Sequence, residues 1–167
     1  NEIDIRIGRI SQGKITLLLY KDSRVDMNIL DATVGAESWE REHYECKGNL
    51  FCKVGINTNY NRENSIPNWV FKSDCGSESK TEAEKGEASD SFKRACVNWG
   101  IGRELYTAPT IDIWVADKDR QPNYNLKDGK CYDKFVVEKV VIENKQITGL
   151  AIRNATLNKR VFVWQKQ

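Results

Sequence analysis

EKGEASDSFKRACVNWGIGRELY, residues 84–106, has the pattern of one amphipathic helix. Its apolar side chains recur every three or four residues, which predicts a single buried face. Thr81 and Glu84 form a capping box before this face, and Gly100 predicts the end of the helix. We therefore expect the apolar face to belong to the core of the fold. The residues of this face are Ala88, Phe92, Ala95, Cys96 and Trp99.

The same helix has two adjacent cations, Lys93 and Arg94, away from its apolar face. At about 100° per residue, they flank Val97 on the far side of the helix. One interpretation is an ordinary solvated face, where Lys-Arg pairs are common. The other is a phosphate contact, because basic side chains on a rigid helix position a nucleic-acid backbone without reading its bases. The composition of the chain leaves both interpretations open.

The residues before this helix predict strands and one further helix. Alternation of apolar and polar residues indicates strands at 3–10 and 14–20. A change to helical period then indicates a helix that begins at Asp22 or Ser23 and stops at Gly35. Turn residues separate the strands expected next, which are 39–46, 49–57 and 68–76.

The residues after the helix predict a β-rich C-terminal part. A short strand and a polar loop within 107–130 come first, and we expect this segment to be the most mobile. A meander follows, because three runs of alternating residues are separated by short turns. Residues 107–167 contain eleven basic and seven acidic residues, a local surplus of four. The strands of the meander are expected at 134–143, 146–153 and 160–165.

The composition predicts a globular chain without a membrane segment or an export signal. Of its 167 residues, 40% are hydrophobic and 30% are charged, and no apolar run approaches the length of a membrane span. The net charge of +2 neither requires nor excludes a polyanionic partner, since a binding groove needs only local charge. The five cysteines contain no CxxC pair, so neither a zinc site nor a disulfide framework is expected.

The glycine-rich and acidic motifs do not indicate a catalytic site. GRISQGK, residues 8–14, nearly matches a phosphate-binding loop, but Ile15 replaces the hydroxyl residue that holds Mg²⁺, so we expect a turn between strands. His43 is the single imidazole, so no Ser-His-Asp or Cys-His arrangement is expected. Asn154-Ala-Thr156 is a glycosylation sequon, which has no role in a reducing compartment. We expect no enzyme activity, no metal and no cofactor.

SDSFKRACVNWGIGREL, residues 89–105, resembles the long-helix motif of the Rad52 family of single-strand DNA annealing proteins. It resembles their phage relatives, the Sak-type recombinases, still more closely. Further pieces agree in order and spacing over about residues 14–106. These are the strand that ends in Tyr20, the helix SRVDMNILDATVG with Trp39 just beyond it, the hairpin strands, and DCGSES before the long helix.

The resemblance implies an α+β fold in which an antiparallel β-sheet packs on the long α-helix. This β-β-β-α annealing core would be followed by the C-terminal β-meander. We expect a single annealing domain over residues 1–167, with the core at 1–106 and the β extension at 107–167.

The resemblance also implies which residues bind DNA. Lys93 and Arg94 match the helix pair that contacts phosphates of the inner groove. Tyr20 matches an aromatic residue of the same groove. Val97 stands where the family often has another basic residue, so this chain departs from the pattern there.

Further basic residues extend this implied set. Arg6 or Arg9 lies near the upstream arginine of the family, and Arg62 lies close to a basic position of a second, outer site. The outer-site lysine of the family before the helix has no clear match, because the linker is shorter, and Lys80 or Lys85 is the expected substitute. The expected DNA-binding residues are Lys93, Arg94, Tyr20, Arg9, Arg6, Arg62, Lys85 and Arg103.

The function that the resemblance implies is single-stranded DNA binding and ATP-independent annealing of complementary strands, in phage homologous recombination and DNA repair. The implied partners are single-stranded DNA, further copies of the chain in a ring or arc, a phage exonuclease and a single-strand DNA-binding protein. No membrane is involved. The expected location is the cytoplasm of a bacterial host, with the gene on a phage or prophage.

Three alternatives stay open at this stage. The first is a nucleic-acid binding module that does not anneal, such as a binder of structured RNA or double-stranded RNA. The second is a metal-dependent nuclease that uses acidic residues such as Asp112 and Asp117. The third is a structural interaction protein without affinity for nucleic acid.

Overall fold

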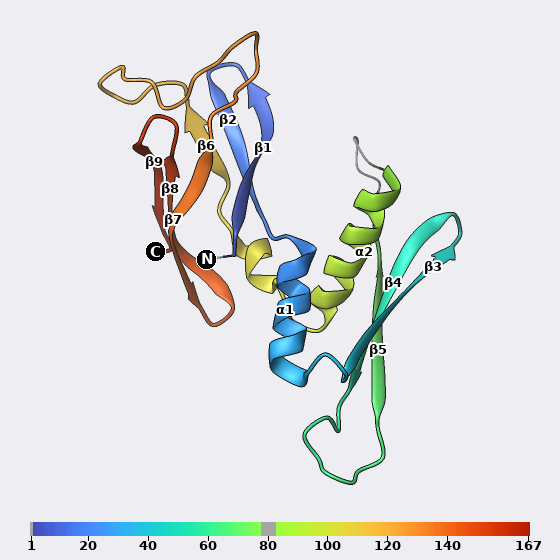
Figure 1. The fold of residues 1–167 in the computed structure, drawn as a ribbon. Helices are drawn as coiled ribbons and strands as arrows, with labels where there is room; N and C mark the ends of the chain where they lie inside the picture. The colour runs from blue at the N-terminus through green and yellow to red at the C-terminus, as the bar shows by residue number, and fades with distance from the viewer. Residues whose placement is uncertain (1, 78–82) are drawn as a thin grey trace. The chain divides into compact units, whose positions relative to one another are not determined.

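The computed structural model describes residues 2–77 and 83–167, without the side chains of residues 83–85. The chain forms two compact units, each with its own buried core (Figure 1). Unit 1 consists of residues 1–21 and 103–167, and unit 2 consists of residues 22–102. None of the helices in the described residues is long and apolar enough to cross a membrane.

The described part of unit 1 contains two antiparallel sheets with three strands each. The first sheet has the order β1-β2-β6, and the second has the order β7-β8-β9. The short 3-10 helix η1 (Arg103–Thr107) precedes β6. The strands expected in the N-terminal and C-terminal parts of the chain are confirmed, and their boundaries differ from the expected ones by about one residue. They are β1 (Asp4–Ser11), β2 (Lys14–Tyr20), β6 (Ile111–Trp114), β7 (Phe135–Glu143), β8 (Gln146–Asn154) and β9 (Lys159–Gln165).

One apolar core joins the two sheets of unit 1. Ile15 and Leu17 of β2 and Ile113 of β6 lie in the same buried cluster as Ile147 and Ile152 of β8. Successive residues of a strand point to opposite faces, so the neighbours of these core residues face away from the cluster. The C-terminal meander is therefore the second layer of the core that supports β1 and β2.

A tight turn joins β1 to β2. The two strands pair in antiparallel register, with Ser11 opposite Lys14. Gly13 has a φ of 78°, a left-handed conformation that favours glycine. The turn expected within GRISQGK is therefore confirmed, and the glycine-lysine motif forms a hairpin.

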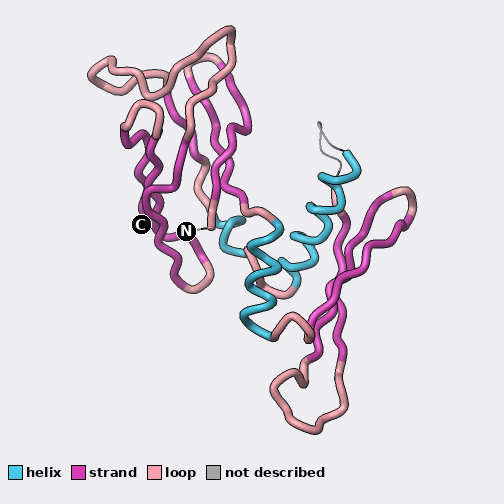
Figure 2. Tube along the Cα trace, viewed as in Figure 1, coloured by secondary structure: helices cyan, strands magenta, loops and turns pink. Residues whose placement is uncertain are grey.

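Unit 2 contains the other sheet and the two α-helices of the described residues (Figure 2). Its antiparallel sheet has the order β3-β4-β5. The α+β class with antiparallel sheets is therefore confirmed. The elements of this unit are α1 (Ser23–Val34), β3 (Trp39–Cys46), β4 (Asn49–Asn57), β5 (Trp69–Cys75) and α2 (Ala83–Asn98).

The expected helix α1 is confirmed at both ends. Asp22 is the N-cap, and its carboxylate accepts a hydrogen bond of 2.8 Å from the backbone N–H of Arg24. Gly35 follows the last turn with a φ of 87°. Leu30 and Val34 are buried, as the helical spacing of apolar residues predicts.

Helix α2 buries its apolar face in the core of unit 2. Phe92, Ala95 and Cys96 are fully buried and share one cluster with Cys52 and Val54 of β4. The expected burial of these three helix residues is confirmed. The expected capping box at the start of the helix lies outside the described residues.

The end of β5 lies very close to the backbone of α2. A Cβ atom on Gly76 would be 2.3 Å from the carbonyl oxygen of Glu87 and 3.0 Å from the amide nitrogen of Ser91. Ser91 is itself fully buried, and its hydroxyl donates to the Ala88 carbonyl at 3.0 Å. Only a residue without a side chain fits at position 76, so this glycine sets the distance between helix and strand.

We expect Gly76→Ala to lower the free energy of unfolding by about 1–3 kcal/mol, because the new methyl group overlaps the backbone of α2. Chemical denaturation of both proteins measures this difference. Gly8→Ala is the comparison variant, since its Cβ would lie 2.7 Å from Cγ and Cδ1 of the exposed Leu18, a side chain that can move where backbone cannot. We expect it to lose less stability than Gly76→Ala. Equal stability of the Gly76 variant and the wild type would contradict the close contact.

A chain of asparagine side chains anchors the long loop between β6 and β7. Asn154 is fully buried, and its Nδ2 donates to the Asn123 carbonyl at 2.9 Å and to Asp133 Oδ2 at 2.7 Å. Asn123 Nδ2 donates in turn to the Trp114 carbonyl at 3.1 Å. The segment expected to be the most mobile is therefore hydrogen-bonded to β8 and to the end of β6.

Two arginines enclose one carboxylate on the β7-β8-β9 sheet. Glu138 Oε2 accepts from Arg160 Nε at 2.5 Å, and Glu138 Oε1 accepts from Arg153 Nη2 at 2.7 Å. The hydrogen bond from Arg160, followed by that from Arg153, lowers the pKa of Glu138 to about 2. Glu138 thereby holds both arginines on the surface of unit 1 and compensates one of their two positive charges.

This depressed pKa has a consequence for acid stability. The stabilisation from Glu138 is present above the ordinary glutamate pKa, 4.5, and is lost as the pH falls toward about 2. We expect NMR titration of the side-chain carboxyls to place the pKa of Glu138 well below the ordinary glutamate value of 4.5. We also expect the difference in melting temperature between wild type and Glu138→Gln to shrink over the same pH interval. A Glu138 pKa near 4.5 would contradict the two ion pairs.

Candidate nucleic-acid interface

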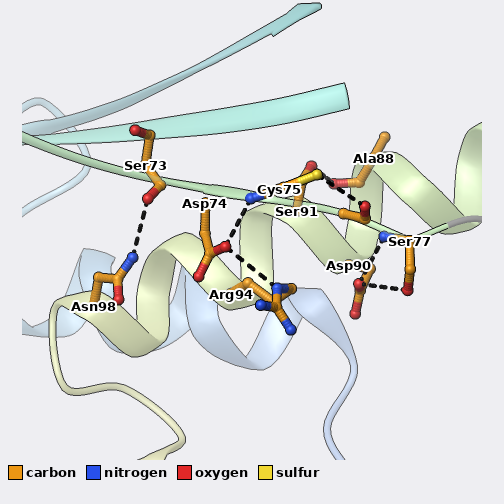
Figure 3. A network of polar contacts seen from close by, with 10 residues as sticks. Ser73, Asp74, Cys75, Ser77, Ala88, Asp90, Ser91, Arg94 and Asn98 are labelled. Carbon is orange, nitrogen blue, oxygen red and sulfur yellow. Dashed lines mark hydrogen bonds and ion pairs between the residues drawn. The ribbon is translucent and has the colours of Figure 1, made fainter. Parts of the chain in front are cut away.

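Polar contacts fix helix α2 along strand β5 (Figure 3). Asp90 Oδ2 accepts from the Ser77 amide at 3.0 Å, and Asn98 Nδ2 donates to the Ser73 carbonyl at 3.1 Å. Arg94 lies one helical turn from each of these contacts and therefore on the same flank of the helix. Its backbone is thus held in place from both sides.

Arg94 has an acidic neighbour on β5. Its Nε lies 3.4 Å from Oδ1 of Asp74, and its side chain remains 46% exposed (Figure 3). The same Asp74 oxygen also accepts from the Cys75 amide at 2.8 Å, which fixes the carboxylate. Exposed ion pairs of this kind contribute little to stability. A phosphate that approaches Arg94 would compete with Asp74 for the guanidinium.

Lys93 is less exposed than Arg94. Its side chain is half-buried, and its ammonium is close enough to Asp22 to contribute to the lowered pKa of that carboxyl. The largest cause of this lowered pKa is the hydrogen bond from the Arg24 amide. Lys93 therefore has a weak electrostatic interaction with the N-cap of α1, whereas Arg94 forms an ion pair with Asp74 of β5.

Three other expected DNA-binding residues lie on one face of a sheet in unit 1. Arg6 and Arg9 are exposed on β1, and Tyr20 is exposed at the end of β2. Arg6 lies opposite Leu18 and Arg9 lies opposite Thr16 in the β1–β2 pairing. Since the alternate residues of β2 face the core, Thr16, Leu18 and Tyr20 face outward. The two arginines and the tyrosine thus share the outer face of the β1-β2-β6 sheet.

The remaining three expected residues belong to η1, to a loop of unit 2 and to the first turn of α2. Arg103 is exposed at the start of η1 in unit 1. Arg62 is exposed on the long loop between β4 and β5, which extends beyond the end of α2 (Figure 1). Lys85 belongs to the first turn of α2, and its side chain lies outside the described residues. The structure therefore places one group of expected residues in each unit.

The acidic residues considered for a nuclease are held by cations. Asp112 accepts hydrogen bonds from Lys14 Nζ and from Thr16 Oγ1, and Asp117 Oδ2 accepts from Lys159 Nζ at 2.7 Å. The lysine hydrogen bond is the largest cause of the lowered pKa of each carboxyl. Within residues 2–77 and 83–167, no three His, Cys, Asp or Glu residues are placed to hold a metal ion.

Trp114 is an exposed aromatic residue that the sequence-based analysis did not single out. It ends β6 with its side chain on the outer face of the sheet, opposite Lys14. The alternation in IDIW, residues 111–114, contains the signal for this position. Ile111 and Ile113 point into the core, so Asp112 and Trp114 point outward.

Comparison with known proteins identifies the class of this chain. A family model described as Rad52/22 family double-strand break repair protein matches residues 3–124. The chain therefore belongs to the Rad52/22 family, and the expected membership of the Rad52 family is confirmed. No curated protein and no solved structure gave a significant match.

Membership of this family implies a function in DNA repair. The function of the Rad52/22 family is DNA strand annealing in double-strand break repair. Proteins of this family bind DNA and form oligomeric rings in general, and its annealing proteins are generally not enzymes. The matched residues 3–124 include both groups of expected DNA-binding residues, the pair on α2 and the outer face of the β1-β2-β6 sheet.

We expect Asp74→Asn to strengthen binding of single-stranded DNA up to about fivefold, the equivalent of roughly 1 kcal/mol, because Arg94 no longer has an anionic partner. Fluorescence anisotropy with a labelled oligonucleotide at fixed salt measures this effect. Glu143→Gln is the matched control, since it removes the same charge from an exposed position of unit 1. Weaker binding by the Asp74 variant would contradict a competition between carboxylate and phosphate.

Proposed function

We propose that this protein binds single-stranded DNA and anneals complementary strands without ATP, as a Sak-type member of the Rad52 family in phage homologous recombination and DNA repair. The match of the family model over residues 3–124 is the observation that supports this function most directly. In this proposal, unit 2 supplies the β-β-β-α annealing core, with α2 presenting Lys93 and Arg94 to the DNA backbone.

The proposed mechanism needs no bond chemistry. Cations on a rigid helix bind phosphates and leave the Watson-Crick edges of the bases free. A second strand can then test its pairing against the first, and the product leaves as duplex. The ion pair between Arg94 and Asp74 suits this cycle, because a site that binds phosphate too tightly would retain the strands.

The proposed assembly is a homo-oligomer, a ring or an arc, in which the DNA follows the outside of the ring. A phage exonuclease that generates single strands and a single-strand DNA-binding protein are the proposed functional partners. The proposed location is the cytoplasm of the bacterial host. Tyr20, Arg6 and Arg9 of unit 1 are proposed as further DNA-binding residues, and Arg62, Lys85 and Arg103 are proposed as additional contacts.

Annealing of two dye-labelled complementary oligonucleotides, without ATP or Mg²⁺ and across a salt series, tests this function. We expect the protein to accelerate annealing, and the acceleration to weaken as salt rises, because phosphate contacts release counterions. Binding without acceleration would favour a nucleic-acid binding module that does not anneal. Absence of binding even at low salt would contradict the proposal.

We expect Lys93→Ala with Arg94→Ala to abolish detectable DNA binding at physiological salt and to leave the fold intact. Loss of two phosphate contacts should also lower the slope of log affinity against log salt by about 1.4 in any residual low-salt binding. Titrations over a salt series provide both quantities, and circular dichroism checks the fold.

The matched control is Lys47→Ala with Lys145→Ala, which removes two cations from exposed hairpin turns. This variant should bind like the wild type. Normal DNA binding by a folded Lys93 and Arg94 variant would refute the assignment of the site to α2.

A further inference from the structure

Trp114 is a large aromatic side chain on the open face of a sheet. It is 61% exposed, although the adjacent Ile113 is only 1% exposed. A tryptophan is costly to leave in water, because burying apolar area is the main stabilising contribution to folding. The indole ring is therefore open on the outer face and accessible to a flat ligand.

Hydrogen bonds fix the backbone around Trp114. Its carbonyl accepts from Asn123 Nδ2 at 3.1 Å, and the carbonyl of Asn123 accepts from the buried Asn154. The next amide, that of Val115, donates to the Gly13 carbonyl of the β1–β2 turn at 2.8 Å. The ring is thus presented from a fixed strand end, which reduces the entropy that a ligand must overcome on binding.

The surroundings of the ring are suited to a polyanion with flat bases. Lys14 Nζ lies 5.6 Å from the centre of the Trp114 ring and also forms an ion pair with Asp112. Arg9 is exposed on the same outer face, opposite Thr16. Asp112 is the acidic residue next to the ring, and it is engaged by both Lys14 and Thr16. The outer face therefore offers the exposed Arg9 beside the ring, together with Lys14, for which a phosphate would compete with Asp112.

Trp114 and Tyr20 both lie on the outer face of the β1-β2-β6 sheet. Tyr20 and Lys14 lie at opposite ends of β2, and Trp114 is paired with Lys14 on the neighbouring strand. Six residues of β-strand span about 20 Å. That length corresponds to roughly six nucleotides at the rise of a B-form strand. The two exposed aromatic rings of Tyr20 and Trp114 thus lie near opposite ends of β2 on the same face of the sheet.

We propose that Trp114 stacks on a base of single-stranded DNA and that Lys14 and Arg9 hold the neighbouring phosphates. This subsite rests on the proposed function and extends it from the backbone contacts of α2 to a contact with a base. Stacking on an aromatic ring tolerates any sequence, because every base has a π-face. It is therefore compatible with a protein that must anneal strands of arbitrary sequence.

Two oligonucleotides of equal length separate base stacking from backbone binding. One is oligo(dT), and the other has the same sugar-phosphate backbone without bases. We expect Trp114→Ala to weaken binding of oligo(dT) about tenfold and to change binding of the abasic oligonucleotide less than twofold. Trp114→Leu provides the same comparison with more apolar bulk if the alanine variant loses its fold. Tyr132→Ala is the matched control, because Tyr132 is another exposed aromatic residue of unit 1, at 73% exposure.

The outcomes distinguish this inference from the proposed function. A loss confined to oligo(dT), with the Tyr132 variant unchanged, supports the stacking subsite. Wild-type affinity of a folded Trp114 variant for oligo(dT) overturns the subsite and leaves the proposed function standing. An equal loss on both oligonucleotides also overturns it, since such a loss does not depend on bases. Failure of the wild type to bind either oligonucleotide at low salt overturns both the subsite and the proposed function.

Discussion

The close approach of α2 to the end of β5 is the constraint on which the candidate interface depends. Gly76 permits this approach, because any side chain there would overlap the helix backbone. With the helix at this distance, Phe92 reaches the core and Arg94 reaches Asp74 across the edge of the sheet. A shift of the helix would change both the buried core and the charge that faces solvent.

Much of the fold could be predicted because local patterns and tertiary packing agree. Helix α1 has its N-cap at Asp22 and its stop at Gly35, and the strands show clear alternation. The grouping of strands into sheets could not be predicted in this way. β2 pairs with β6, which lies about ninety residues further along the chain, and alternation contains no information about such distant partners. The domain assignment for 1–167 stays a prediction.

The candidate site could also be predicted only in part, because local spacing contains no information about distant partners. Helical spacing predicted Lys93 and Arg94 on the outer half of α2, but it could not show that Asp22 and Asp74 interact with them. These acidic partners come from other elements, and only the assembled unit brings them near. Trp114 was missed because a four-residue strand is too short for its alternation to stand out.

The buried Asn154 has a consequence for how this protein can be produced. It is the first residue of the Asn-Ala-Thr sequon, and its amide nitrogen is committed to Asn123 and Asp133 inside unit 1. A secretory expression host would meet this sequon on the nascent chain, before β8 has closed over it. A glycan attached there could not enter the core, so glycosylated chains would be trapped without a folded unit 1. Expression in a bacterial cytosol avoids this competition between modification and folding.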